Sequence, residues 1–367
     1  MHDLVAKFVG EHFPWIVPPI TMAKDKKGQQ NTILDIAEAL KLSPATISRA
    51  LNNHPHVKDQ TKADVLQMAA QLGYRRNNMA SGLRSNKTHT VGLIVPRISM
   101  YFHAEVITAI QNGLHKYGYN LIICQSNDSV VMEKELTEIL FSSRVDALIA
   151  SCTLFTEDFT HFNPLLESGT PVIFYDRVPL QELGAVIIKG DDFNGGYVAA
   201  QHLIECGCKR IAHLSGPMSS NLYQNRSLGF LKAMADHELP VKADWIFHQE
   251  LTPANAHNAM NQLFSDDIVP DGLFTDNDSS AIAALEYARE KGLAVPGELK
   301  IVGYSNDPRT AIISPSITTI EQFPHEVGNK VVEVLISLLK NPASRALTEE
   351  PVVMPIQLIR RASTSLL

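Results

Sequence analysis

The sequence has few cysteines, and it contains none of the common catalytic or cofactor-binding motifs. The four cysteines have neither the spacing of a zinc site nor that of a secreted disulfide framework. We find no GxGxxG after a strand-like run, no GxxxxGK(S/T), no GxSxG and no HExxH. These absences predict a protein that is not an enzyme, uses no cofactor or metal ion, and keeps reduced thiols in the cytoplasm.

The sequence also has no long uninterrupted hydrophobic run. The apolar stretch near its start is broken by Pro14, Pro18 and Pro19, and it contains Asp3 and Glu11. This pattern fits neither a secretory signal nor a membrane span. We expect residues 1–31 to be a disordered extension, of which the first 21 are dispensable or follow from a misassigned start codon.

Positive charge is scarce overall but concentrated in one segment. The net charge of −7 by itself argues against binding to nucleic acid. Residues 32–88, however, carry eight Lys or Arg against four Asp or Glu, a formal +4, whereas residues 89–367 carry −12. A small basic module joined to a large acidic body fits a protein that touches phosphates at one end only.

The segment from Thr32 to Leu51 predicts two short helices joined by a tight turn. Thr32 and Asp35 have the spacing of a capping box. Ser43-Pro44 restarts the chain with a cap residue and a proline at the first helical position. A third helix is predicted from about Asp59 to Leu72, with Gly73 as its stop.

The second of these helices has an outer face of small and hydrogen-bonding side chains. Ala45, Ser48, Arg49 and Asn52 recur there at helical spacing. A helix that enters a groove about 12 Å wide and reaches base edges needs such a face. The alternative is an ordinary solvated helical hairpin.

The segment from Asp35 to Thr88 resembles the DNA-binding headpiece and hinge of the lactose/galactose repressor (LacI/GalR) family, without a gap. The matching run is DIAEALKLSPATISRALNNHPHVKDQTKADVLQMAAQLGYRRNNMASGLRSNKT. The resemblance implies DNA contacts from the headpiece and from a hinge helix whose leucine, Leu83, enters the minor groove. The implied residues are Thr32, Ser43, Ala45, Thr46, Ser48, Arg49, Asn52, His56, Asn78, Ala80, Ser81, Leu83 and Arg84.

The hinge residues themselves suit that role. A helix of about eight residues containing Gly82 is too short to persist alone in water. Small residues at 80–82 allow two such helices to approach closely, and Leu83 offers an apolar wedge. A disordered basic linker is the alternative, and it also describes the DNA-free state.

From Thr90 onward, short apolar runs alternate with helical stretches, which predicts parallel βαβ units in two lobes. Strands are expected in VGLIVP, NLIICQ, DALIAS, PVIFYD, AVIIKG, RIAHLSG, DWIFHQE, DGLFTDN and KIVGYSN. Ligands bind beyond the carboxyl ends of such strands, so the residues just past them are the candidates.

This body resembles the effector domain of the same family, which is similar to type I periplasmic sugar-binding proteins. The predicted fold is therefore an all-α helix-turn-helix headpiece plus a two-lobed α/β domain with parallel sheets and helices on both faces. We assign residues 1–31 to the extension, 32–76 to the headpiece, 77–88 to the hinge and 89–367 to the effector domain. Lobe 1 is expected at about 89–189 and 319–349, and lobe 2 at about 190–318 and 350–367.

The resemblance implies that Arg226 clamps effector oxygens, that Tyr101 and Phe102 form an aromatic wall, and that Asn277 belongs to the family's NDxxA element. For Arg226 a structural ion pair is the alternative, and for the two aromatics a place in the core. Ser305 and Arg97 depart from the family pattern, which favours an acidic sugar derivative slightly. The effector-site candidates are Arg97, Tyr101, Phe102, Ser151, Asp176, Arg226, Leu251, Asn277 and Ser305.

The predicted function is a regulator, most simply a repressor, that binds double-stranded DNA as a homodimer at a pseudo-palindromic operator. A small-molecule effector, expected to be a carbohydrate, controls it from the cleft between the lobes. The rival is a sugar-binding protein of a transport or sensing system. That rival would need a signal peptide and no headpiece, and the sequence shows the reverse.

Overall fold

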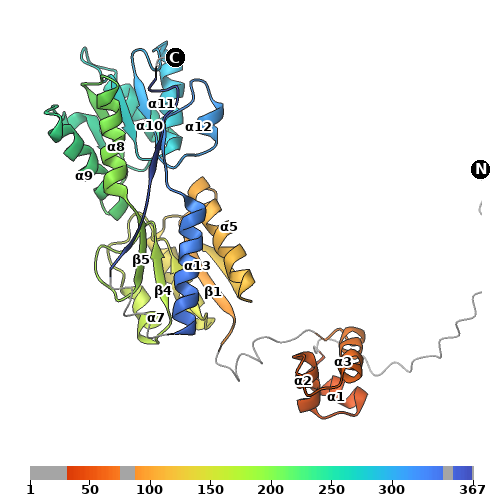
Figure 1. Ribbon diagram of the computed structural model, residues 1–367. Coiled ribbons are helices and arrows are strands. Elements are labelled where there is room, and N and C mark those ends of the chain that lie inside the picture. Colours follow the sequence, from red (N-terminus) through yellow and green to blue (C-terminus); the bar gives the residue numbers. More distant parts are fainter. Residues whose placement is uncertain (1–30, 75–86, 342–349, 366–367) are drawn as a thin grey trace, which may run out of the picture. The chain divides into compact units, whose positions relative to one another are not determined.

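The computed structural model describes residues 31–74, 87–341 and 350–365. The contacts divide the chain into two units, with the boundary between residues 81 and 82. The smaller unit contains α1 (Ile33–Leu40), α2 (Pro44–Leu51) and α3 (Asp59–Gln71), which Figure 1 shows as a compact group. The predicted extension lies outside the described residues, apart from Asn31.

The headpiece helices form where the sequence signals them. Thr32 and Asp35 make the predicted capping box, and Ser43 caps α2 ahead of Pro44. The third helix ends at Gln71, one residue before the predicted end, and Gly73 follows with a φ of 62°. Ile36, Ile47 and Val65, one from each helix, are fully buried against one another. Burying a side chain of this size stabilises the fold by about 1.5–3 kcal/mol, so three such residues define a small common core.

The larger unit begins with a parallel sheet of lobe 1, whose strand order is β11-β5-β4-β3-β1-β2. Its strands are β1 (Thr90–Val95), β2 (Asn120–Gln125), β3 (Ala147–Ala150), β4 (Val172–Tyr175), β5 (Val186–Gly190) and β11 (Val352–Met354). Its helices are α5 (Tyr101–Lys116), α6 (Val130–Ser142), η1 (Thr160–Phe162), α7 (Asn163–Glu167) and α13 (Pro324–Lys340).

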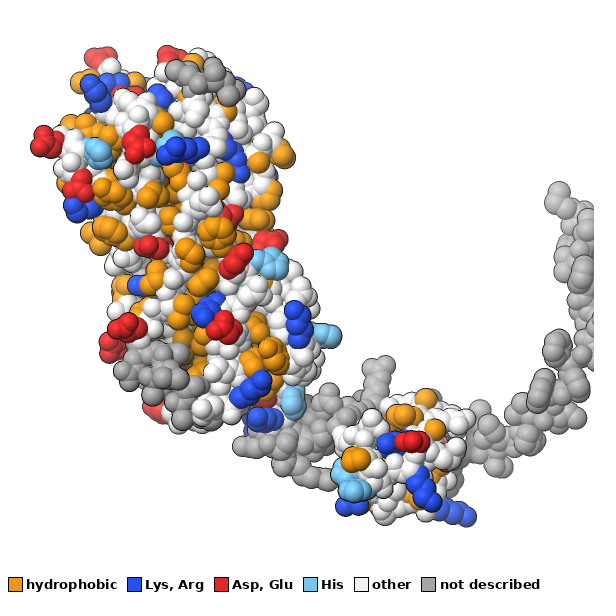
Figure 2. All heavy atoms as spheres, viewed as in Figure 1, with side chains coloured by type: hydrophobic (Ala, Val, Ile, Leu, Met, Phe, Trp, Pro, Cys, Tyr) orange, Lys and Arg blue, Asp and Glu red, His pale blue; other side chains and the backbone are white. Residues whose placement is uncertain are grey.

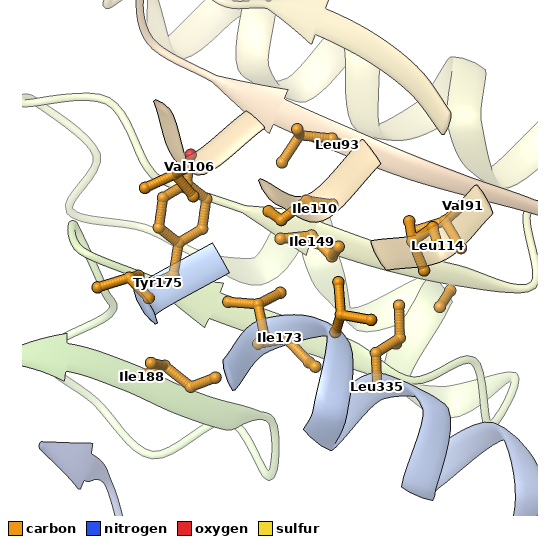
Figure 3. Packing of buried hydrophobic residues seen from close by; sticks show 14 of the residues in the cluster. Val91, Leu93, Val106, Ile110, Leu114, Ile149, Ile173, Tyr175, Ile188 and Leu335 are labelled. Atoms are coloured by element: carbon orange, nitrogen blue, oxygen red, sulfur yellow. The ribbon is translucent and has the colours of Figure 1, made fainter. Parts of the chain in front are cut away.

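Both faces of this sheet are covered, because alternate residues of each buried strand point to opposite sides. Leu93, Ile149 and Ile173 belong to the core under α5 and α13, which Figure 3 shows from close by. Leu148 and Phe174, their neighbours along β3 and β4, belong to the core under α6 and α7. The near-continuous apolar runs of the sequence are therefore explained by burial on both faces.

Lobe 2 has the same design with a smaller parallel sheet, in the order β7-β6-β8-β9. Its strands are β6 (Ile211–Ser215), β7 (Ile246–His248), β8 (Gly272–Thr275) and β9 (Lys300–Val302). Its helices are α8 (Asp192–Glu205), α9 (Asn221–Asp236), η2 (Ala243–Trp245), α10 (Pro253–Leu263), α11 (Asp278–Lys291) and α12 (Arg309–Ile312). α8 and α9 share one core, and α10 and α11 share the other.

The chain crosses between the lobes three times, at places that differ in part from the predicted ones. The first crossing follows β5, close to the predicted Lys189. β10 (Thr319–Glu321) pairs with β12 (Gln357–Ile359), and Ile320 lies in a core of lobe 2. The second crossing therefore follows Glu321, so the predicted start of the lobe 1 segment at 319 is too early.

The last crossing corrects a second boundary. The prediction assigned residues 350–367 to lobe 2, whereas β11 pairs with β5 in the sheet of lobe 1. The crossing therefore lies between Met354 and Gln357. β11 is only three residues long and half exposed, so its apolar pattern is too weak to show which sheet it joins.

The two lobes contact each other directly beside the carboxyl ends of their strands. The Asn221 side chain accepts from the backbone N–H of Val178, at 2.9 Å, and donates to the carbonyl of Asp176, at 3.1 Å. Leu154 of lobe 1 packs against Leu222 and Tyr223 of lobe 2. These contacts define the cleft side of the domain.

Among the described residues, no helix combines the length and the apolar character that crossing a membrane requires.

Candidate functional site

The outer face of α2 presents the side chains that the sequence predicts for base contacts. Ala45, Arg49 and Asn52 are exposed, and Ser48 is half-buried beside them. The Asn52 amide donates to the carbonyl of Ser48, at 2.8 Å. The face therefore combines little bulk, one guanidinium group and hydrogen-bonding groups, which is what major-groove readout requires.

The remaining predicted headpiece residues have mixed positions. Ser43 Oγ accepts from the N–H of Thr46 and lies 2.9 Å from Thr46 Oγ1, so both hydroxyls serve the start of α2. Thr32 caps α1, and His56 is exposed in the loop before α3. Lysine and arginine side chains are visible on the headpiece surface in Figure 2. Asn78, Ala80, Ser81, Leu83 and Arg84 lie outside the described residues.

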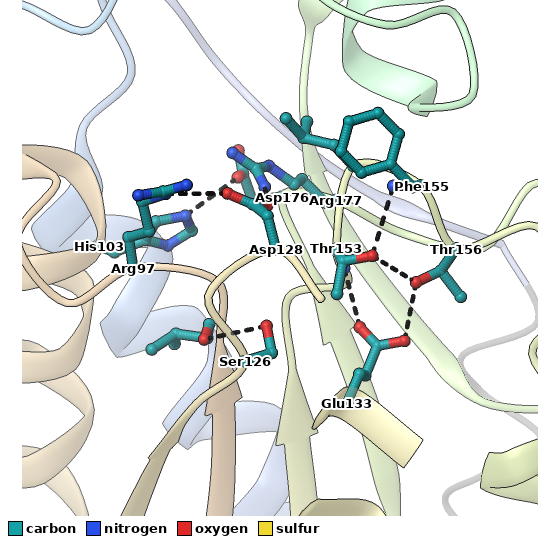
Figure 4. Close-up of polar contacts among 12 residues, drawn as sticks. Arg97, His103, Ser126, Asp128, Glu133, Thr153, Phe155, Thr156, Asp176 and Arg177 are labelled. Carbon is teal, nitrogen blue, oxygen red and sulfur yellow. Dashed lines mark hydrogen bonds and ion pairs between the residues drawn. The ribbon is translucent and has the colours of Figure 1, made fainter. Parts of the chain in front are cut away.

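In lobe 1, two arginines share one carboxylate beyond the carboxyl ends of the strands (Figure 4). Arg97 Nε donates to one oxygen of Asp128 at 3.0 Å, and Arg177 donates to the other at 2.5 Å. Although burial acts to raise it, these two cations hold the pKa of Asp128 below its usual value. Arg97 is half exposed and Arg177 is buried, so the cluster extends from the interior to the rim of the cleft.

Asp176 and His103 form a second polar pair next to this cluster. Their side chains lie 3.8 Å apart, and His103 Nδ1 is 3.2 Å from the hydroxyl of Tyr175. Burial, helped by the charge of Arg177, lowers the pKa of His103 to about 3, so its ring is neutral at pH 7. Burial also raises the pKa of Asp176, whose backbone has a φ of 60°. Among the described residues, Asp176 forms no ion pair with a lysine or arginine, so its carboxylate is a mostly buried acceptor next to the charges of Arg177 and Arg226.

Arg226 is buried in lobe 2, where it makes the structural contacts that the sequence left as an alternative. Its Nε donates to Asp192 at 2.9 Å, and another of its nitrogens donates to the carbonyl of Asp276 at 2.8 Å. Its guanidinium lies over the ring of Tyr304, 3.5 Å from the centroid. Burial raises the pKa of Asp192 to about 6, against the opposing charge of Arg226. Arg226 therefore holds lobe 2 together through α8, α9 and the end of β8.

The side chains of two further candidates in lobe 2 are held by hydrogen bonds within the protein. Asn277 caps α11 by accepting from the N–H of Ser280, and its amide donates to the carbonyl of Leu251 at 3.0 Å. Ser305 has a φ of 108°, and its hydroxyl donates to Gln322 at 2.9 Å. Both side chains are therefore fixed in place by the protein itself.

The three remaining lobe 1 candidates have different positions. Tyr101 begins α5 and is half-buried. Phe102 is 7% exposed and belongs to the hydrophobic core, so the prediction that it forms a cleft wall is wrong. Ser151 is fully buried, and its hydroxyl has no hydrogen-bond partner among the residues that the structure describes.

The sequence prediction missed Asp128, Arg177, His103 and Asp192. Asp128 follows the carboxyl end of β2, so the rule that selected Arg97 would also have found it. Arg177 directly follows the predicted Asp176. His103 and Asp192 lie within helices, and no sequence signal separates them from ordinary helical residues. Within the described ranges, no group of three His, Cys, Asp or Glu side chains is arranged to hold a metal ion.

Two family descriptions match the chain. Residues 32–77 match the family described as "Bacterial regulatory proteins, lacI family", and residues 200–364 match a periplasmic binding protein-like domain. The first match covers the three headpiece helices, and the second covers most of lobe 2 with the end of the chain.

Individual proteins show the same likeness over most of the chain. The HTH-type transcriptional repressor PurR of Actinobacillus pleuropneumoniae is 31% identical over 84% of this chain and 91% of its own length. The lac repressor dimer bound to operator and the anti-inducer ONPF is similar in structure, with a TM-score of 0.81 and 23% identity over 92% of this chain and 99% of that one. A LacI family transcriptional regulator from Enterococcus faecium with bound ribose has a TM-score of 0.64 and 26% identity, over 76% of this chain and 99% of that one.

Proposed function

The chain belongs to the LacI family of bacterial regulatory proteins, and from this premise we propose that it represses transcription as a homodimer on a pseudo-palindromic operator, under the control of a carbohydrate. It is a DNA-binding transcriptional repressor with a domain for a small-molecule effector. The dimer, the form of the operator and the class of effector are the finer parts of the proposal. It acts in the cytoplasm, where it meets the chromosome.

The outer face of α2 carries the DNA-binding part of the proposal. Arg49 is exposed and can bond bidentately to guanine, while Ser48 and Asn52 can serve other base edges. Two such helices in a symmetric dimer would read two half-sites about one helical turn apart, so the operator is expected to be roughly palindromic. The predicted hinge at 77–88 would then form helices only on DNA.

A homodimer is supported by apolar side chains on one edge of lobe 1. Ile122 and Ile123 of the edge strand β2 are 41% and 37% exposed, and Val131 and Ile139 of α6 are 68% and 56% exposed. Hydrophobic side chains also reach the surface of both lobes on the face shown in Figure 2. Exposed apolar side chains on an edge strand and on a helix of the same lobe are candidates for a protein–protein interface.

The mixed donors and acceptors of the cleft support a carbohydrate effector. Sugar hydroxyls both donate and accept, and the cleft offers the Asp176 carboxylate as acceptor, Arg97 as donor and the half-buried ring of Tyr101 as an apolar surface. Asp128 pairs with both Arg97 and Arg177, and the neighbouring Asp176 carboxylate brings these two arginines and two aspartates to a formal charge of zero. The charge of Arg97 therefore no longer favours an acidic sugar derivative. We therefore expect an uncharged carbohydrate, bound without chemical conversion.

The proposed control follows from the two-lobed design. An effector that contacts both lobes favours one arrangement of lobe 1 relative to lobe 2. In a dimer that arrangement would set the spacing of the paired hinges, and hence the affinity for the operator.

The test is a titration of full-length protein against a labelled DNA fragment that carries the promoter of its own gene. We expect a complex at about 50 mM salt that weakens by a factor of about 10³–10⁵ at about 200 mM, because six to ten phosphate contacts would be lost to competing ions. A fragment of equal length without an operator is the control. No complex at low salt, with or without metabolites, would refute the proposal.

A further inference from the structure

Lobe 1 has a cavity at the amino ends of its strands, opposite the effector cleft. It is a pocket of about 730 Å³ that is open to solvent, and it lies between the loop from α6 to β3 and the loop from α7 to β4, beside the end of α13. These loops precede the amino ends of the parallel strands, whereas Arg97 and Asp176 follow the carboxyl ends. The volume is in the range of small-molecule sites, about 300–1,000 Å³. We call it the base cavity. The residues that line it include Lys87, Phe141, Arg144, Asp146, Leu165 and Thr170.

The base cavity combines an apolar wall with two cations that have no ion-pair partner among the described residues. The charged groups of Lys87 and Arg144 make no hydrogen bond or ion pair with any residue in the described ranges. Phe141 is 41% exposed beside them, and Leu165 and Leu339 also line the cavity. The arrangement is complementary to a small molecule with an anionic group on an apolar ring or chain.

The third charged residue of the cavity, Asp146, accepts hydrogen bonds from Thr88 and His89, at the end of the predicted hinge. One of its carboxylate oxygens accepts from the N–H and the hydroxyl of Thr88, at 2.7 and 2.9 Å, and the other accepts from the N–H of His89, at 2.9 Å. The Thr88 hydroxyl also lies 3.1 Å from the carbonyl of Arg144. The residues that line the cavity therefore also anchor the end of the predicted hinge.

We propose that the base cavity is a second binding site, separate from the effector cleft, for a small carboxylate or phosphate carried on an apolar body. The planar guanidinium of Arg144 can bond two oxygens of such an anion, and Lys87 adds a point charge at the end of the hinge. A bound anion would connect the hinge directly to the loop before β3. Its effect on operator affinity rests on the proposed function, but its binding does not.

Phenyl phosphate is a suitable probe, with phenol and inorganic phosphate to separate the contributions of ring and charge. Full-length protein without DNA is titrated by calorimetry, up to about 10 mM, because a ligand of this size is expected to bind with a Kd of about 1 mM or below. We expect saturable binding of phenyl phosphate and at least about tenfold weaker binding of phenol.

Two variants locate the site. Lys87→Ala/Arg144→Ala removes both cations from exposed positions, and Ser142→Trp obstructs the cavity without touching them. Both are expected to weaken phenyl phosphate at least about tenfold. The control Lys116→Ala/Lys209→Ala removes two exposed lysines elsewhere and should bind like the wild type.

Absent saturation, or equal affinity in the wild type and both cavity variants, would overturn the proposal. Because the measurement contains no DNA, the two proposals can fail separately. Binding of the operator without binding of the probe would refute only the second site. Binding of the probe at this site without a complex with the promoter would refute only the proposed function.

Discussion

Arg49 is the exposed cation at the centre of the outer face of α2. Its removal takes away a bidentate contact to one base but leaves the helix intact, because the exposed Arg49 side chain makes no hydrogen bond or ion pair with the described residues. We expect Arg49→Ala to reduce discrimination between the operator and a single-base variant at the contacted position by about 1–3 kcal/mol. Fluorescence anisotropy with the two fragments measures this difference. The exposed Gln71→Ala, on α3, should discriminate like the wild type, and an unchanged ratio in Arg49→Ala would contradict the placement.

Arg226 makes a different prediction, since it is buried with Asp192. Arg226→Ala leaves the Asp192 carboxylate buried without its cation, which typically costs about 3–5 kcal/mol. We expect a lower midpoint of denaturant unfolding, with part of the loss recovered in Arg226→Ala/Asp192→Asn. The exposed pair Arg360–Glu205 provides the control, because Arg360→Ala should cost no more than about 1 kcal/mol. If Arg226→Ala is as stable as the wild type and has lost only its response to the effector, then Arg226 serves to bind the effector and not to stabilise lobe 2.

Asp278 links stability to pH. Burial raises its pKa to about 7, although Thr319 and the N–H of Asp307 donate to its oxygens, at 2.7 Å each. Because the folded-state pKa is raised, its contribution to stability is complete below about pH 4 and is lost as the pH rises through about 7. The asparagine of Asp278→Asn does not titrate. The stability of the wild type relative to this variant should therefore be greater at pH 5 than at pH 8, and denaturant midpoints at the two values that keep a constant difference would contradict this.

At the scale of single residues, the sequence predicts where a residue lies relative to the strands better than it predicts which side chains surround it. Arg97, Asp176 and Arg226 were selected because they follow strand ends or match a motif, and the structure places the first two just beyond β1 and β4 and the third in α9. The pairing of Arg97 with Asp128 and of Arg226 with Asp192 could not be predicted, because folding brings these side chains together from 31 and 34 residues away in the chain. Phe102 was misplaced because a helix start offers both a cleft-facing and a core-facing position one residue apart.

At the scale of elements, α8 and α9 approach closely enough to require glycine. A methyl group on Gly229 would overlap the carbonyl oxygen of Phe193, and one on Gly196 would overlap that of Arg226. We expect Gly229→Ala to force the helices apart and to cost about 3 kcal/mol in unfolding free energy. The neighbouring Leu228 is 55% exposed on the same helix, so Leu228→Ala should stay within about 0.5 kcal/mol of the wild type. Similar unfolding midpoints for the two variants would show that the helices adjust freely.

Elements with strong local signals were predicted closely, and weak ones were not. β1 and β2 fall within a residue of their predicted runs, and caps define the headpiece helices. The start of α8 at Asp192 has a weaker signal, because Asp191 caps the helix just ahead of a glycine pair, which is typical of a helix break. β11 was assigned to the wrong lobe because three half-exposed residues carry no information about their partner strand.

At the scale of the whole molecule, the effector cleft and the anchor of the hinge lie at opposite ends of the lobe 1 strands. The cleft residues lie at the carboxyl ends of the lobe 1 strands, and the anchor of the hinge at Asp146 lies at their amino ends. A rigid-body shift of lobe 1 would therefore move both ends of its strands together, because its packed interior is too dense to deform locally. In a dimer, such a shift in each protomer changes the distance between the two hinges without any rearrangement inside the lobe.

The proposed dimer can be tested at its apolar edge. Ile139 is 56% exposed on α6, and a twofold interface would bury it twice, so Ile139→Glu would place two like charges in one contact. We expect sedimentation velocity to show a monomer at about micromolar concentration, and operator affinity to fall towards that of a single half-site, because the second headpiece is no longer held nearby. Ile268→Glu, at a position in lobe 2 that is 65% exposed, is the matched control and should remain dimeric. If Ile139→Glu sediments as a dimer and binds the operator fully, the interface lies elsewhere on the domain.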